Sequence, residues 1–175
     1  MATIRVPGRQ IHLTEDSAIR QFLGERGVWY EHRPTVSLRA NAPDNEVLQL
    51  HDHWVTPFME KNGYRTADVI RVTPETPNLP AIRDKFIREH THSEDEVRFF
   101  VEGDGLFWFH KEAPIDEVFA VHCAAGDLLT VPANTKHWFV LGPEPRVCAI
   151  RIFTDQAGWV PNYTGSGIDQ QYRWL

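Results

Sequence analysis

The spacing of apolar and polar positions changes about halfway along the chain. From about residue 88 onward, short runs rich in β-branched and aromatic residues alternate with the Gly, Pro and Asn residues that favour turns. This regular alternation is typical of an antiparallel β-sandwich or small barrel. We predict strands within residues 97–110, 117–123, 126–132, 137–142 and 146–153.

The first 85 or so residues have mainly the spacing of helices. Within residues 13–27, Thr14 is a candidate N-cap, acidic residues occupy the first turn, and Gly27 is a candidate end. The apolar positions of this predicted helix are Ile19, Phe22 and Leu23.

A longer helix is predicted within residues 42–64. Asp44 is its candidate N-cap, and Pro57 should kink or divide it. A short strand at residues 67–74 and a short helix at residues 79–86 complete this part of the chain.

No internal repeat, low-complexity segment or linker interrupts the sequence. We therefore expect one domain over residues 1–175. It would comprise a mostly helical part to about residue 85, a β-barrel core over about 86–155 and a polar tail over about 156–175, which Tyr172 and Trp174 could dock.

Composition narrows the classes of protein that this chain can be. A formal charge of −6 argues against nucleic acid or an anionic membrane as a partner. No apolar run is long enough to span a bilayer, and the first residues lack the apolar core of a signal peptide, so we expect a cytoplasmic protein. Cys123 and Cys148 lie in apolar strands, which favours reduced core thiols over a disulfide.

Polar residues interrupt the apolar pattern just before the first strong strand. If residues 90–100 are extended, alternation places a set of polar side chains and one aromatic ring on one face. Two imidazoles and a carboxylate on one buried wall are suitable ligands for a divalent transition metal. The set is His90, His92, Glu96, Arg98 and Phe100.

A pair of histidines two residues apart is a weak signal by itself. His90 and His92 could instead be surface residues of a charged turn. His51 and His53 show the same spacing within a predicted helix, where positions two apart do not share a face, and we interpret them as surface or cap histidines.

A third histidine strengthens the case for a metal. Residues 126–137 read as a strand, a tight turn and the start of another strand, which would return His137 to the first wall. Asn134 can occupy the left-handed position of that turn.

These two segments resemble the two motifs of the cupin proteins. His90, His92, Glu96 and Gly103 match the first motif, and Gly126, Pro132 and His137 match most of the second. The departures are Asp84 where the first motif often begins with Gly, Asn134 in place of Gly, and Leu141 where Asn is common.

Within the cupins, residues 89–110 closely resemble the acireductone dioxygenases of the methionine salvage pathway. The helical N-terminal portion, residues 63–72, residues 131–139 and the region of Trp159 are also similar, so the resemblance covers most of the chain. It implies a mainly β, cupin-type antiparallel β-sandwich or jelly-roll barrel with several N-terminal helices packed on it.

The resemblance also implies a ligand set. His90, His92, Glu96 and His137 would hold one divalent metal, and two remaining water positions favour Fe²⁺ or Ni²⁺ over a structural tetrahedral Zn²⁺. Arg98 would favour the dianion of the substrate, with a structural ion pair to Glu102 or Asp104 as the alternative role.

Two acids carry auxiliary roles by resemblance alone. Glu89 matches a position linked to metal incorporation, and Asp95 matches one linked to the relay of local conformational change. Their sequence context alone would make both of them solvated acids.

The implied reaction is cleavage of acireductone by O₂. In this family the iron form gives formate and 4-methylthio-2-oxobutanoate, and the nickel form gives formate, carbon monoxide and 3-methylthiopropanoate. Phe86, Phe139 and Trp159 are candidates to contact the methylthio tail, with Phe100 and Phe107 behind them. By strand parity Trp108 and Trp138 are packing residues, and His110 and His122, which lack partner spacing, are structural.

Two alternatives stay open at this point. One is another cupin dioxygenase with the same ligands, and the other is a cupin that binds a small molecule or metal without catalysis. The resemblance further implies a monomer.

Overall fold

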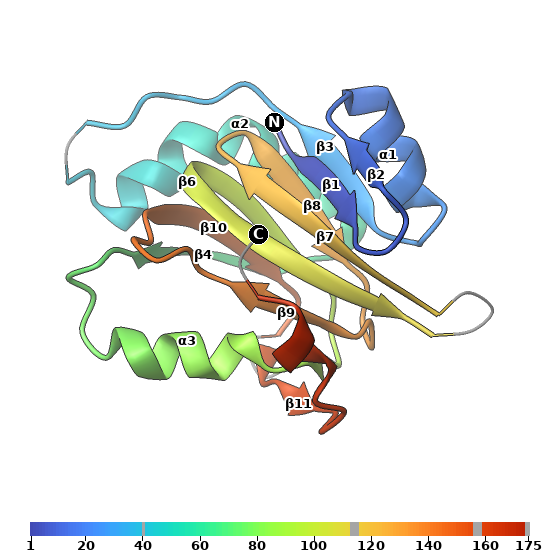
Figure 1. Cartoon of the computed structure of the whole chain (residues 1–175). Coiled ribbons are helices and arrows are strands. Elements are labelled where there is room, and N and C mark those ends of the chain that lie inside the picture. The colour runs from blue at the N-terminus through green and yellow to red at the C-terminus, as the bar shows by residue number, and fades with distance from the viewer. Residues whose placement is uncertain (40, 113–115, 156–158, 174–175) are drawn as a thin grey trace.

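The structure is a computed structural model that describes residues 1–39, 41–112, 116–155 and 159–173 (Figure 1). One long strand lies at its centre and pairs with four other strands. This strand is β6 (Glu96–Lys111). The other strands are β1 (Thr3–Val6), β2 (Ile11–Leu13), β3 (Trp29–His32), β4 (Thr66–Val72), β5 (His90–Thr91), β7 (Glu117–Ala124), β8 (Asp127–Val131), β9 (His137–Val140), β10 (Val147–Phe153) and β11 (Asn162–Tyr163).

Two sheets share β6. Its first half pairs with β8 and β10, and its second half pairs with β7 and β9. One sheet therefore runs β4–β10–β6–β8–β3, and the other runs β11–β5–β9–β6–β7–β1–β2. Every pairing between the described strands is antiparallel, which confirms the mainly β, antiparallel prediction, and all five strands predicted after residue 88 are present.

The change of partners along β6 occurs where two glycines allow close packing. Gly103 has a φ of +75°, and a Cβ there would lie 1.3 Å from the carbonyl oxygen of Arg146. A Cβ at Gly105 would lie 2.2 Å from the Phe139 ring. A side chain at either position would push β10 or Phe139 away from β6.

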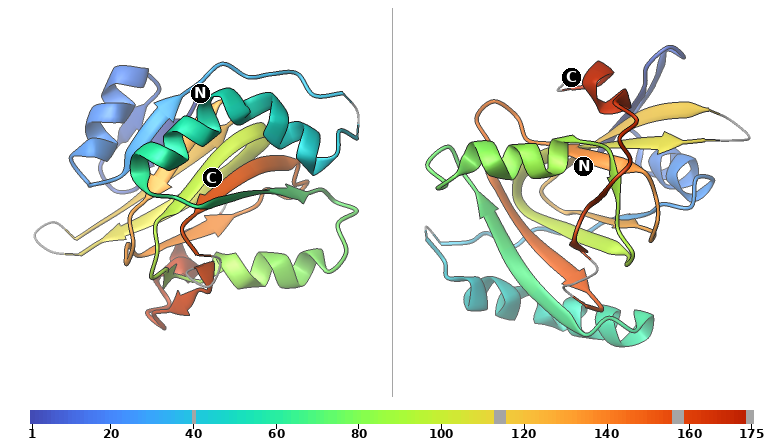
Figure 2. Two further views of the ribbon diagram at one scale, coloured as in Figure 1. Left: turned by 180° about the vertical axis from the view of Figure 1, so that it is seen from behind. Right: turned by 90° about the horizontal axis from the view of Figure 1, so that it is seen from below.

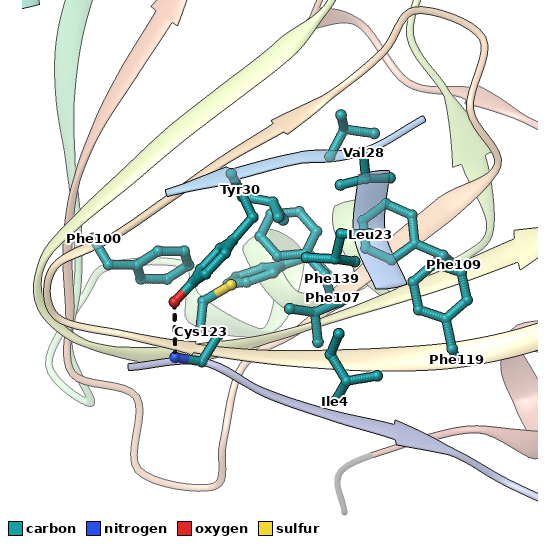
Figure 3. Packing of buried hydrophobic residues seen from close by; sticks show 14 of the residues in the cluster. Ile4, Leu23, Val28, Tyr30, Phe100, Phe107, Phe109, Phe119, Cys123 and Phe139 are labelled. Atoms are coloured by element: carbon teal, nitrogen blue, oxygen red, sulfur yellow. Dashed lines mark hydrogen bonds between the residues drawn. The ribbon is translucent and has the colours of Figure 1, made fainter. Parts of the chain in front are cut away.

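The interior between the sheets is filled largely by aromatic side chains, as Figure 3 shows. Phe107 lies 4.8 Å from Phe139 between ring centroids, and Phe109 stacks on Phe119 at 5.0 Å. Cys123 lies in this cluster, and both it and Cys148 are free and buried, which confirms the prediction of reduced core thiols.

Among the described residues, three α-helices flank the sheets (Figures 1 and 2): α1 (Asp16–Gly24), α2 (Asp44–Asn62) and α3 (Leu79–Ile87). Val47 and Val55 of α2 pack on Val97 and Phe99 of β6, so α2 covers the outer face of β6, as expected for an N-terminal helix. A 3₁₀ helix, η2 (Ile168–Gln171), lies near the C-terminus. None of the helices in the described part of the chain has the length and apolar character needed to cross a membrane.

The N-terminal part is less helical than predicted, because it also contributes β1, β2, β3 and β4 to the sheets. Of these, only β4 was expected. β1 pairs with β7 and β3 pairs with β8, so their extended form depends on partners more than 90 residues away in sequence. Short segments of this kind carry too little local pattern to be recognised.

The predicted helix ends are also corrected. Glu15 and Pro43 occupy the N-cap positions of α1 and α2, in place of Thr14 and Asp44, and α1 ends at Gly24. Pro57 does not divide α2; it lies on the exposed side, where water can bond the carbonyl that loses its helical partner.

The interpretation of the two helical histidines holds for His53, which is exposed, and is wrong for His51. His51 is 1% exposed, its Nδ1 lies 2.7 Å from the carbonyl oxygen of Val47, and its ring packs on Phe99. The bond to the preceding helical turn satisfies one ring nitrogen and allows this histidine to be buried.

Candidate metal centre

Three histidines meet where β5 lies beside β9. His90 pairs directly with His137 across these strands, and their ring centroids are 4.6 Å apart. The ring of His92 lies 4.9 Å from His90 and 5.3 Å from His137. One nitrogen from each ring lies within 4.8 Å of the others, and all three residues are buried. The structure therefore brings the predicted histidines together.

Backbone contacts orient two of these rings. Nδ1 of His90 lies 2.7 Å from the carbonyl oxygen of Arg88, and Nδ1 of His137 lies 2.7 Å from that of Thr135. A carbonyl can only accept, so each Nδ1 carries a proton, and Nε2 is the nitrogen left to face a metal ion. Burial, with a smaller contribution from His137, lowers the pKa of His90 to about 3, which keeps the imidazole neutral.

Glu96 completes this group from the start of β6. One of its oxygens, Oε2, lies 3.0 Å from His137 Nε2 and 3.3 Å from His92 Nε2. The other, Oε1, lies 2.7 Å from Nη2 of Arg98. Burial by itself would raise the pKa of Glu96, but Arg98 and the two histidines outweigh it and hold the pKa well below its usual range. The carboxylate is therefore ionised while it is 3% exposed.

The prediction of one extended segment over residues 90–100 needs correction. β5 ends at Thr91 and β6 begins at Glu96, with a bend between them. The turn before β9 fixes this bend: the Asn134 amide donates to the carbonyl of His92 at 2.8 Å, and the Ala133 amide donates to Asp95 Oδ1 at 2.9 Å.

Asn134 has a φ of +61°, which confirms its predicted left-handed turn position. Asp95 also accepts a hydrogen bond from the Tyr64 hydroxyl at 2.9 Å. It is thus a bridge between the two ligand segments and is not a freely solvated acid.

The donor set fits a divalent transition metal. It comprises three imidazoles and one ionised carboxylate, all inside the protein. Neither ring nitrogen of His92 makes a hydrogen bond with any described residue, although both nitrogens are buried. Such an arrangement is costly without a cation at its centre, and a metal ion would satisfy both the lone pairs and the charge.

Arg98 lies beside this group and is 5% exposed. Its ion-pair partner is Glu96, and not Glu102 or Asp104 as the structural alternative proposed. Its guanidinium lies 4.6 Å from the ring centroid of Phe139 and 5.9 Å from that of Trp159. A permanent positive charge with planar donors is therefore held between the carboxylate and an aromatic wall.

The three aromatic side chains predicted to contact a substrate all lie next to the histidines. Trp159 stacks on His92 at 6.0 Å, and Phe86 lies 6.3 Å from His90. Phe139 lies against Arg98, with Phe100 and Phe107 behind it in the core.

Trp108 and Trp138 belong to a separate cluster outside this group, as predicted from parity. They stack at 5.9 Å and contact Tyr172, which docks the C-terminal segment as expected. Trp174 lies outside the described residues.

A buried hydrogen-bond network around Glu89 was missed from sequence. Glu89 is 1% exposed, and its carboxylate accepts from the hydroxyls of Thr164 and Ser166 at 2.5 and 2.8 Å. Nδ1 of His110, which we expected to be only structural, lies 2.7 Å from Glu89 Oε2. Burial raises the pKa of Glu89, but these hydrogen bonds outweigh it and the pKa is lowered.

This network attaches the C-terminal segment to the strand that carries His90. Tyr163 of β11 pairs with His90, and the Thr164 amide donates to the carbonyl of Glu89 at 3.1 Å. No local pattern around residues 164 and 166 indicates this contact. The resemblance that singled out Glu89 was the one signal that pointed to it.

Comparisons with known proteins agree with this geometry. The model of the ARD/ARD' family matches residues 28–161. An acireductone dioxygenase of Picosynechococcus is 51% identical over 92% of this chain and 91% of its own length, and one of Alcanivorax borkumensis is 45% identical over 98% and 94%.

A solved structure has the same fold. The acireductone dioxygenase from Bacillus anthracis, with a cadmium ion in its active centre, superposes with a TM-score of 0.83 at 34% identity, covering 93% of this chain and 98% of that one. Together, the family match and the close relatives over nearly the whole chain show that this chain belongs to the ARD/ARD' family.

Proposed function

We propose that this chain is an acireductone dioxygenase that uses one Fe²⁺ or Ni²⁺ bound by His90, His92, Glu96 and His137. The observation that carries the proposal is the buried group of three imidazoles and one carboxylate, with Arg98 against it, in a chain 51% identical to a relative of that activity. Because these relatives are dioxygenases, we infer that this chain is an enzyme whose substrates are a small molecule and O₂.

When bound, the metal supplies Lewis acidity and a redox-active centre for reaction with O₂. The protein supplies the remaining functions. His90 and His137 are preoriented by their backbone bonds, so that little rearrangement is needed to bind the ion. Glu96 brings a negative charge that neutral imidazoles lack.

Arg98 is placed to favour the ionised form of the substrate. An acireductone is an enediol beside a carbonyl, and its dianion needs positive charge from the protein as well as from the metal. The guanidinium is buried, so its field is weakly screened, and it can donate to a substrate oxygen while it remains paired to Glu96.

The aromatic residues serve to exclude water and to hold the apolar end of the substrate. Phe86, Phe139 and Trp159 lie within ring contact of the ligands or Arg98. Their faces offer favourable contacts to a methylthio group. A dry site also strengthens the charge interactions of Arg98.

The products depend on the metal under this proposal. The iron form would give formate and 4-methylthio-2-oxobutanoate, and the nickel form would give formate, carbon monoxide and 3-methylthiopropanoate. Since both forms use the same four ligands, metal analysis of the protein from its own source, together with product identification, would decide between them.

The decisive experiment follows the ultraviolet absorbance of acireductone prepared without air. On admission of air, the metal-loaded protein should remove the absorbance rapidly and the metal-free protein slowly. Equal rates would refute catalysis and favour a binding protein. A metal-loaded chain that accepts other enediols equally well would favour another cupin dioxygenase.

We also propose that the enzyme is a cytoplasmic monomer without nucleic-acid or membrane partners. The charge of −6 supports the absence of polyanionic partners. Light scattering coupled to size exclusion should give the mass of one chain, and a mass of two chains would contradict the monomer.

A further inference from the structure

A cavity lies on the outer face of the β6 sheet, beneath α2. Its volume is about 590 Å³, which is within the usual range for small-molecule sites. Thr130 in its lining pairs with Val97, which belongs to the cluster that packs on α2. The cavity is therefore on the opposite face of the sheet from Glu96 and Arg98.

A row of aromatic rings forms one wall of this cavity. Trp29 stacks on Phe58 with centroids 5.8 Å apart and planes inclined by 27°, and Phe58 stacks on Tyr64 at 5.7 Å and 20°. Trp29 at the end of the row is 44% exposed. Near-parallel rings with an exposed end offer a surface on which one more planar ring can stack.

Two polar atoms in the lining are buried without partners. Nε of Arg33 and Oγ1 of Thr130 make no hydrogen bond with any described residue. The Arg33 guanidinium also lies 4.5 Å from the ring centroid of Trp54, so it is held at the cavity by stacking. A buried polar atom without a partner is unfavourable, and a polar ligand group would remove that cost.

One lysine of the lining is available to pair with an anion. Both acids already have partners: Glu31 is 3.0 Å from Arg33, and Asp95 accepts from the Tyr64 hydroxyl and the Ala133 amide. Lys61 is exposed, and within the described part of the chain it forms no ion pair. The free positive charge at this cavity is thus that of Lys61.

We propose that this cavity binds a small molecule that combines a planar heteroaromatic ring with an anionic group. The ring stacks on Trp29, and the anion lies between Lys61 and Arg33. A phosphate or a carboxylate satisfies this chemistry equally, so both are tested. The proposal does not depend on the activity at the metal centre.

Titration calorimetry on the full, metal-loaded chain tests the proposal with two probes. Adenosine monophosphate carries a ring and a phosphate, and nicotinate carries a ring and a carboxylate. Adenosine and inorganic phosphate, which each supply one half of the chemistry, should bind at least several-fold more weakly than the monophosphate. Saturable binding of either ring-bearing anion in the millimolar range or below is expected.

Variants then locate the binding. Trp29→Ala should weaken it by about tenfold, the loss typical of one base-stacking ring. Lys61→Met should weaken it by about fivefold, as for an exposed charge. Leu50→Ala and Lys85→Met are matched controls, since they remove an exposed apolar residue of α2 and an exposed lysine outside the cavity, and both should bind as the parent does.

The results with the two probes distinguish a phosphate ligand, a carboxylate ligand and the absence of a site. Binding of the monophosphate alone identifies a phosphate ligand, and binding of nicotinate alone identifies a carboxylate ligand. Absence of saturable binding for both probes overturns the proposal. Binding that Trp29→Ala and Lys61→Met leave unchanged also overturns it, because the probe would then occupy the metal centre or another surface.

Discussion

Alternate residues in the first half of β6 face two regions of the protein. Both regions are buried, but one is apolar and the other contains charged side chains. On the outer face, Val97 and Phe99 are fully buried against α2. On the inner face, Glu96 and Arg98 are 3% and 5% exposed, yet they carry full charges. Burial therefore does not distinguish the two faces, whereas the kind of partner does.

The two faces contribute differently to stability. Apolar burial on the outer face stabilises the fold by about 25 cal/mol per Å². A buried ion pair contributes little net stability, because desolvation offsets most of the attraction between the charges. The inner face is therefore maintained for binding and chemistry. Substitutions there should change metal content and turnover, and substitutions on the outer face should change stability.

The largest expected effect is on the inner side, at His137. Replacing His137 with Ala removes a ligand that is preoriented by Thr135, so metal content should fall below one equivalent and turnover should fall by at least about a thousandfold. Metal analysis and the absorbance assay measure this. Added metal should raise the melting temperature of the parent protein but not that of the variant.

His53→Ala is the matched control for His137, because His53 is an exposed histidine of α2, which covers the face of β6 opposite to the ligands. It should retain metal, turnover and melting temperature. A full equivalent of tightly held metal in the His137 variant would contradict the ligand assignment and would break the distinction between the two faces.

The next effect is on the outer face, at Phe99. This ring is fully buried and lies 4.8 Å from Trp54 and 5.4 Å from His51. Phe99→Ala should lower the free energy of unfolding by about 3–5 kcal/mol through the cavity that it leaves. Denaturant unfolding of the metal-free protein measures this loss without the contribution of the ion.

Metal stoichiometry of the folded Phe99 variant provides the contrast. It should stay at one ion per chain, because α2 supplies none of the proposed ligands. Loss of metal in a sample that remains folded would show that the outer face also determines the geometry of the inner one.

The contrast between the two faces also explains how much could be predicted. The strands after residue 88 have a strong local pattern, and the structure contains all of them. β1 and β3 are short and become strands through β7 and β8, so their sequences alone do not specify their structure. His51 was assigned to the surface because its bond to Val47 is invisible in the residue spacing.

The same distinction between local pattern and distant contacts applies to the site. The histidines of the site share a strand pattern and a turn, and the sequence was sufficient to predict that they meet. Glu89 needed partners from residues 110, 164 and 166, whose contacts depend on how the C-terminal segment folds back. The bend at residues 92–95 depends likewise on amides from the distant turn at Asn134.

A smaller effect is expected at Arg98. This substitution tests whether the reaction needs the planar guanidinium or only a positive charge. Arg98→Lys keeps a positive charge near Glu96 but loses the planar group of donors. Metal content should be retained, and kcat should fall by about tenfold to a hundredfold, as expected from the loss of one charged hydrogen bond in the transition state.

Arg39→Lys is the corresponding control, since Arg39 pairs with Glu46 through two nitrogens on the exposed surface. It should leave kcat unchanged. If Arg98→Lys also leaves kcat unchanged, the guanidinium has no part in the reaction and the inner ion pair is structural.

The smallest expected effect is at Thr164, behind the inner face. Its hydroxyl donates to Glu89 Oε1 at 2.5 Å, next to His90. Thr164→Val keeps the shape and removes this bond, while Ser166 and His110 still bond the carboxylate. Metal affinity, measured by competition with a chelator, should fall by about tenfold, the lower end for residues that orient a ligand.

Thr56→Val makes the same chemical change on the outer helix, where the Thr56 hydroxyl donates to Asp52 at 2.6 Å on the surface. It should leave metal affinity unchanged. Equal losses in the two variants would mean that any lost hydroxyl weakens metal binding through general stability. A loss of metal affinity in the Thr164 variant alone would show that the bond from Thr164 to Glu89 supports His90. The C-terminal segment would then contribute to metal binding although it supplies no ligand.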